Sequence, residues 1–150
     1  MTEEADLYRL LIADVYELAG ESRRTSEALA GEVGQTAARW HVLSVLSDGP
    51  RTVAGAARRL GLARQSVQRV VTDLVRADLA RLRTNPDHAR APLVELTAEG
   101  RSTLRALVRR SDADRSAVLR EADLTRDDLD GARAVLRRLT ATLRDHARER

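Results

Sequence analysis

Five polar side chains that can hydrogen-bond to the edges of nucleic-acid bases lie within positions 64–69 of this 150-residue chain. Arginine and glutamine suit base edges because each forms a bidentate pair, arginine with guanine and glutamine with adenine. The alternative interpretation is a polar helix face that only meets solvent. The candidate base-reading residues are Arg64, Gln65, Ser66, Gln68 and Arg69.

Positive charge is concentrated in the segment around these residues. Residues 51–90 hold nine Arg and three Asp, a net charge of +6. The first fifty residues hold four Arg and nine acidic residues, net −5, and the last sixty hold thirteen Arg and eleven acidic residues, net +2. Such focused charge is typical of proteins that bind double-stranded DNA. Seven Arg are therefore candidates for phosphate or minor-groove contacts: Arg51, Arg58, Arg59, Arg76, Arg81, Arg83 and Arg90.

A pair of short helices is predicted to position the base-reading candidates. Thr52 can cap a first helix that Gly61 ends, and a second helix follows over about residues 63–77. A short turn containing glycine between two such helices is typical of a helix-turn-helix. The first two turns of the second helix, which carry the polar residues, are the part that reaches bases when such a helix enters the major groove.

A hairpin, or wing, is predicted directly after this helix. Residues 80–83 and 92–96 favour short strands, and the polar loop between them is rich in turn-forming residues. An arginine near a hairpin tip can enter a narrow minor groove, where the negative potential is enhanced. Arg90 is placed for this role, and Asp87 could hold the loop or orient an arginine. The alternative is an exposed loop with scattered charges.

Long helices are predicted on both sides of this region. Leu7, Leu11 and Leu18 begin an apolar stripe in a helix over about residues 4–32, and further helices follow Thr97 and Thr125. In the last helix the apolar residues follow spacings of three and four, a heptad pattern that implies a partner helix. The seam includes Leu129, Leu136, Leu139 and Leu143. The predicted fold class is mainly α with a small β wing.

The helix predicted over residues 36–47 carries Trp40 and His41, which could line a small-molecule pocket. The alternative for a buried aromatic residue is plain core packing. A core is expected to consist of Leu, Val and Ala, since the chain has no Phe and three aromatic residues in all.

The sequence argues against several other kinds of site. No cysteine is present, and the three His, at positions 41, 88 and 146, lack ligand spacing, so no metal site is expected. No phosphate-binding loop, nucleophile elbow or catalytic triad is found, so neither an enzyme nor a cofactor is expected. No apolar run could span a bilayer and the acidic N-terminus does not resemble a signal peptide, which predicts a cytoplasmic protein without a membrane partner.

The chain resembles the MarR (multiple antibiotic resistance regulator) family. The resemblance lies in the run from Gly61 to Val71, and in the wing pattern of Asp87, two residues, Arg90, a strand, and then Leu96-Thr97-x-x-Gly100. The family generally has Asp-x-Arg, so the spacing here is one residue longer. The resemblance implies one MarR-like domain over residues 1–150, with a DNA-binding lobe at 36–100 and dimerisation helices at 4–33 and 101–148.

This family resemblance implies a homodimeric winged helix-turn-helix repressor with a pocket for a small ligand, such as an aromatic acid, between the lobe and the dimerisation helices. A dimer would bind a pseudo-palindromic operator in double-stranded DNA, with half-sites about 10–10.5 base pairs apart. One rival hypothesis is a winged helix that contacts proteins and not DNA. A small enzyme or a metal-sensing regulator is the other, and the missing ligand sets weigh against both.

Overall fold

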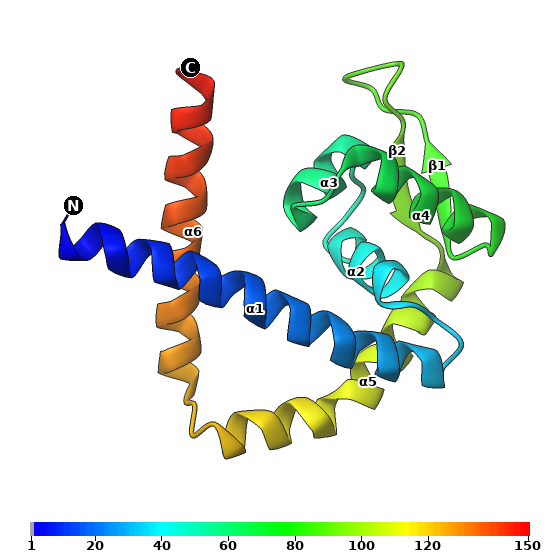
Figure 1. The fold of residues 1–150 in the computed structure, drawn as a ribbon. Coiled ribbons are helices and arrows are strands. Elements are labelled where there is room, and N and C mark those ends of the chain that lie inside the picture. The colour runs from blue at the N-terminus through cyan, green and yellow to red at the C-terminus, as the bar shows by residue number, and fades with distance from the viewer. Residues whose placement is uncertain (1) are drawn as a thin grey trace. The chain divides into compact units, whose positions relative to one another are not determined.

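The computed structural model describes residues 2–150. Within them the fold is mainly helical, with six helices and one two-stranded antiparallel sheet (Figure 1), which confirms the predicted fold class. The elements in chain order are α1 (Glu3–Glu32), α2 (Ala37–Leu46), α3 (Val53–Leu60), α4 (Arg64–Arg76), β1 (Ala80–Arg83), β2 (Leu93–Leu96), α5 (Ala98–Glu121) and α6 (Arg126–Arg148).

Threonine caps fix where several helices begin. The Thr36 hydroxyl accepts a hydrogen bond from the backbone N–H of Arg39 at 3.1 Å, and the Thr52 hydroxyl accepts one from Gly55 at 3.0 Å. Each cap satisfies a backbone donor that has no partner inside its helix. Gly61 ends α3 in the left-handed conformation, with φ of 66°, which only glycine adopts without strain. The predicted Thr52 cap and the predicted turn at Gly61 are therefore confirmed.

The wing sheet has one face toward the core and one toward solvent. β1 and β2 pair in a register that sets Ala80 opposite Leu96 and Arg81 opposite Glu95. Side chains alternate along a strand, and Val94 and Leu96 are accordingly buried while the residues between and before them are more exposed. The outer face of the hairpin is thus left for polar side chains.

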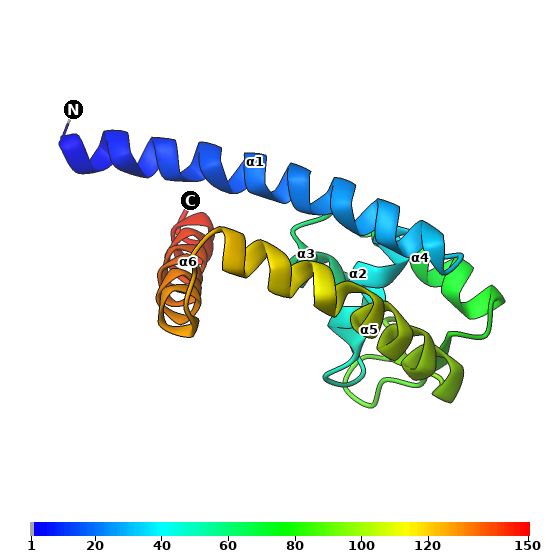
Figure 2. The ribbon, with the colours of Figure 1, turned by 90° about the horizontal axis from the view of Figure 1, so that it is seen from below.

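Two compact units divide the chain, Met1–Arg110 and Ser111–Arg150, and the boundary falls inside α5. In the first unit, the N-terminal part of α1 extends past α2, α3 and α4 (Figures 1 and 2). The core of this unit consists of Leu, Val, Ala and Trp side chains, as expected from a sequence without Phe. Its largest fully buried members are Leu43, Leu46, Leu74, Leu107, Val42, Val67, Val71 and Val94.

The outer helices carry many exposed apolar side chains in the single chain. In α1, Leu7 is 58% exposed and Leu18 is 70% exposed, while Leu11 is half-buried. In α6 no residue is buried, and the heptad positions Leu129, Leu136 and Leu143 are exposed, with Leu139 half-buried. The division of the chain into a DNA-binding lobe and dimerisation helices stays a prediction.

Candidate nucleic-acid interface

Helix α4 packs one apolar face into the hydrophobic core. Val67, Val71 and Leu74 are each at most 1% exposed, and Val70 is half-buried beside them. The turn before the helix is fixed because the N–H of Leu62 donates to the carbonyl of Ala57 at 3.0 Å. These contacts determine which side of α4 remains available to a partner.

All five candidate base-reading residues of α4 are exposed to solvent. They are Arg64, Gln65, Ser66, Gln68 and Arg69. The Gln68 side-chain amide lies 3.4 Å from the Thr72 hydroxyl, a long and weak hydrogen bond. Neither Arg64 nor Arg69 forms an ion pair within residues 2–150, so their guanidinium groups remain available to base edges.

Arg51 has a structural task beside its candidate role at phosphates. Its backbone forms a bridge with Val94, in which the N–H of Arg51 donates at 3.0 Å and the N–H of Val94 donates back at 2.7 Å. Its guanidinium Nε donates to the carbonyl of Val45 at 3.1 Å. Arg51 is therefore half-buried and attaches the wing to the end of α2, a role that the charge pattern did not reveal.

The wing loop is closed by an asparagine. The Asn85 side-chain amide donates to the carbonyl of Ala91 at 2.9 Å, and its oxygen accepts from the N–H of Asp87 at 3.0 Å. Asp87 and Arg90 are both exposed, and no ion pair joins them in the described part of the chain. Loop closure thus depends on Asn85, and Asp87 and Arg90 form no ion pair with each other.

Glu95 is a charged residue of this interface that the sequence did not single out. Its carboxylate accepts from Arg81 Nε at 2.7 Å and from Arg83 Nη1 at 3.2 Å. The hydrogen bond from Arg81 holds the pKa of Glu95 below its usual value, and the nearby charges of Arg81, Arg83 and Arg101 add to this effect. The strand register, which the structure supplies, places Glu95 opposite Arg81.

The remaining basic candidates lie on the last turns of two helices. Arg58 and Arg59 end α3, Arg76 ends α4, and all three side chains are exposed. Cations near a helix C-terminus are favourable because they offset the negative end of the helix dipole. The helix dipole explains these positions locally, and contact with phosphates stays a prediction for all three.

Trp40 and His41 occupy different environments on α2. Trp40 is 3% exposed and belongs to the core cluster, which favours the core interpretation. His41 is half-buried, and this burial lowers the pKa of its imidazole. The positive charge of Arg23 lowers that pKa further, while Glu27 opposes the shift. Glu27 also accepts a hydrogen bond from the backbone N–H of Ala37 at 2.9 Å, which anchors the start of α2 to α1.

Two further features of residues 2–150 concern metal binding and membranes. No group of three or more His, Cys, Asp or Glu side chains is placed to hold a metal ion. No helix in that range is both long and apolar enough to cross a membrane.

Curated relatives and a family profile match this chain. The profile of the MarR family matches residues 33–91, which include the helix-turn-helix and the wing loop. An uncharacterized protein of Mycobacterium tuberculosis, Rv2011c, is 55% identical over 101 residues, which are 67% of this chain and 71% of that protein.

Solved structures of regulators have a similar fold. A MarR family transcription regulator is 26% identical, with a TM-score of 0.68 over 100% of this chain and 99% of the other. A mutant of Escherichia coli MarR in complex with operator DNA is 22% identical, with a TM-score of 0.68 over 91% of this chain and 95% of the other. Staphylococcus aureus MarR in complex with salicylate and kanamycin is 14% identical, with a TM-score of 0.72 over 93% of both chains.

The helix-turn-helix, the basic wing and these likenesses define a winged helix-turn-helix transcription regulator. The chain belongs to the MarR family, and it is a DNA-binding transcriptional regulator of that family. This family consists of transcription regulators, which agrees with the expectation that the chain is not an enzyme.

Proposed function

We propose that this regulator is a homodimeric repressor that binds a pseudo-palindromic operator and is released by a small aromatic ligand. The observation that carries the DNA-binding mode is the exposed polar face of α4, which lies opposite a face buried against the lobe. The wing that follows has the same sign of charge, and residues 51–90 carry a net +6. Both features suit a groove lined by phosphates.

Within this lobe we divide the polar residues by role. The residues of the first turns of α4, Arg64, Gln65, Ser66, Gln68 and Arg69, are proposed to contact bases. The arginines that surround α4 are proposed to contact phosphates, which fix the position of the protein without reading sequence. Arg90, exposed at the wing loop, is proposed to contact the minor groove.

Dimerisation is supported by apolar surface that the single chain leaves in solvent. The α6 positions Leu129, Leu136 and Leu143 recur every seven residues and are 37%, 39% and 53% exposed. A seam with that period is buried when two helices pack side by side. Two copies related by a two-fold axis would then present two α4 helices to half-sites about 10–10.5 base pairs apart.

Two observations support release by a ligand. The S. aureus MarR structure contains salicylate, and half-buried His41 lies on α2, beside the helix interface with α1. A ligand that binds one dimer conformation more tightly than the other would shift the population between them. A changed spacing between the two α4 helices would lower the affinity for the operator.

The division of roles can be tested by selecting preferred duplexes from a random pool. Arg69→Ala should relax the base preference at one position of each half-site, because a bidentate arginine–guanine pair contributes about 1–3 kcal/mol of discrimination. Arg59→Ala, which removes an exposed arginine at the end of α3, should weaken all duplexes alike and leave the preference unchanged.

Equal and uniform weakening by both substitutions would refute this assignment of roles. Absence of any duplex binding would favour a protein-binding winged helix. In the same assay, salicylate should reduce occupancy of the selected duplex, and unchanged occupancy at millimolar salicylate would refute release by an aromatic acid.

A further inference from the structure

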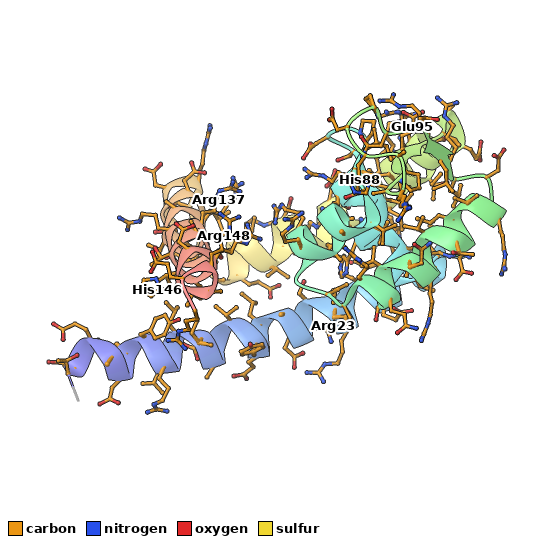
Figure 3. All side chains as sticks on the ribbon, turned by 90° about the horizontal axis from the view of Figure 1, so that it is seen from above. Arg23, His88, Glu95, Arg137, His146 and Arg148 are labelled. Atoms are coloured by element: carbon orange, nitrogen blue, oxygen red, sulfur yellow. The ribbon has the colours of Figure 1, made fainter. Side chains whose placement is uncertain are left out.

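The outer face of the wing holds two arginines and one carboxylate in a fixed arrangement. Arg81 and Arg83 lie two residues apart on β1, so their side chains leave the same face of the sheet. Glu95 on β2 is the direct cross-strand partner of Arg81. Its two carboxylate oxygens are shared between the arginines, one at 2.7 Å from Arg81 Nε and the other at 3.2 Å from Arg83 Nη1. Glu95 is labelled in Figure 3.

These three side chains form two layers. The Glu95 side chain is 13% exposed, whereas the side chains of Arg81 and Arg83 are 67% and 54% exposed. The carboxylate therefore lies beneath the guanidinium groups, and an approaching phosphate meets positive charge first. Arg81 donates only Nε to Glu95 and keeps both terminal amino groups, while Arg83 keeps Nε and Nη2.

We propose that Glu95 is a positioning residue of the DNA-binding wing, which holds Arg81 and Arg83 with their remaining donors turned toward the phosphate backbone. The proposal rests on the proposed phosphate contacts of these two arginines. Duplex DNA carries one phosphate per roughly 3.4 Å of axis on each strand, so two guanidinium groups on one strand face can meet the same backbone. Glu95 acts through the arginines and does not itself contact DNA.

Positioning by Glu95 should strengthen DNA binding because a free arginine side chain is flexible. A free arginine side chain loses rotamer freedom when it is fixed on a phosphate, and this loss weakens binding. An arginine already held by a carboxylate has lost most of that freedom before DNA arrives. Charge-assisted hydrogen bonds are short and directional, so the carboxylate also determines where the free N–H groups point.

Removal of Glu95 should change the affinity for DNA in opposite directions, depending on whether Glu95 positions the arginines or only contributes its charge. Without the carboxylate the wing gains one unit of positive charge, and charge alone would tighten binding to DNA. Loss of positioning would instead weaken binding and reduce the number of phosphates that the wing neutralises. Glu95→Gln separates the two because glutamine keeps the length of the side chain and one carbonyl acceptor.

The experiment measures the affinity of the full-length protein for a random-sequence duplex of about 30 base pairs, over a range of salt concentrations. Sequence does not matter here because phosphate contacts are independent of sequence. Glu95→Gln should bind about three- to tenfold more weakly than wild type, and the salt slope should fall by about 0.9 for every phosphate that is no longer neutralised. Misfolding lowers the active fraction but leaves the slope of the remaining protein unchanged.

Asp87→Asn is the matched control, because it makes the same change of charge in the same hairpin at a residue that pairs with neither Arg81 nor Arg83. It should tighten binding by about twofold through charge alone. In an Arg81→Ala, Arg83→Ala background, Glu95→Gln should also tighten binding, since no arginine remains for Glu95 to position.

Three results would overturn the proposal for Glu95. They are tighter binding by Glu95→Gln, weaker binding with an unchanged salt slope, and an equal loss in Asp87→Asn. Failure of the proposed wing contacts would give a different result, in which the Arg81→Ala, Arg83→Ala protein keeps the affinity and salt slope of wild type.

Discussion

Gly100, in the first turn of α5, packs directly against the backbone between α4 and β1. A Cβ atom at this position would lie 1.9 Å from the carbonyl oxygen of Leu79, closer than any van der Waals contact allows. Thr97 joins the same backbone, because its hydroxyl donates to the carbonyl of Asp78 at 2.7 Å and its N–H donates to the carbonyl of Leu79 at 3.1 Å. The Leu-Thr-x-x-Gly pattern thus has a physical basis in the junction of the wing with α5.

Gly100→Ala should destabilise the protein by about 1–3 kcal/mol, the usual range when added volume forces backbone to shift. Thermal unfolding measures this loss. Gly131→Ala is the control, since Gly131 lies inside α6 with no heavy atom within 4 Å of its ideal Cβ. That substitution should raise stability by about 0.5–1 kcal/mol through helix propensity. Equal unfolding temperatures for the two variants would contradict the contact with Leu79.

His41 gives the stability of the protein a dependence on pH. Burial lowers the pKa of its imidazole, and Arg23 adds to this shift while Glu27 opposes it. The unfolded chain takes up the proton near pH 6.5, whereas the folded chain resists protonation to a lower pH. The stability contributed by neutral His41 is therefore present above about pH 6.5 and is lost as the pH falls toward the lowered value.

The unfolding temperature of wild type should accordingly fall between about pH 7.5 and pH 5.5 by more than that of His41→Gln. His88→Gln, at an exposed position in the wing loop, should retain the wild-type dependence. Parallel pH profiles for wild type and His41→Gln would show that the buried imidazole does not affect folding in this range.

Among the helices and strands, residue types a few positions apart were sufficient to predict the helix-turn-helix and the two wing strands. The threonine caps and Gly61 act within a few residues of themselves, so their effect can be read along the chain. Apolar spacing along α4 left open whether Val70 or Val71 joins Val67 and Leu74 on its buried face, and the structure buries Val71. The sequence also predicted both wing strands, within one residue of their observed bounds.

Contacts between elements could not be predicted in the same way. The bridge from Arg51 to Val94 spans forty-three positions, and the carboxylate of Glu95 meets Arg81 and Arg83 only because of strand register. The number of charges in a segment of sequence does not show that Arg51, Arg81 and Arg83 have partners within the protein. In the structure Arg51 is tied to Val45, and the two wing arginines share one carboxylate.

At the scale of the whole molecule, charge and apolar surface are separated along the chain. The helix-turn-helix and wing segment carries +6, whereas the first fifty residues carry −5. Most of the exposed leucines in the described residues lie instead on α1 and α6, outside that segment. This separation suits a protein that dimerises through the outer helices and binds DNA through the basic segment. Dimerisation on DNA can be measured directly.

That measurement is sedimentation velocity of the protein with a fluorescent duplex of about 30 base pairs from the region upstream of its gene. We expect two chains per duplex at low salt for wild type and for Ala141→Glu, which places a charge on the face of α6 away from the seam. Leu136→Glu, which charges the seam itself, should sediment as a monomer and bind at least tenfold more weakly, since linked sites gain about 10²–10⁴ in avidity. A single wild-type chain on the duplex, or a Leu136→Glu protein that still binds as a pair, would refute DNA binding by a dimer joined through the α6 seam.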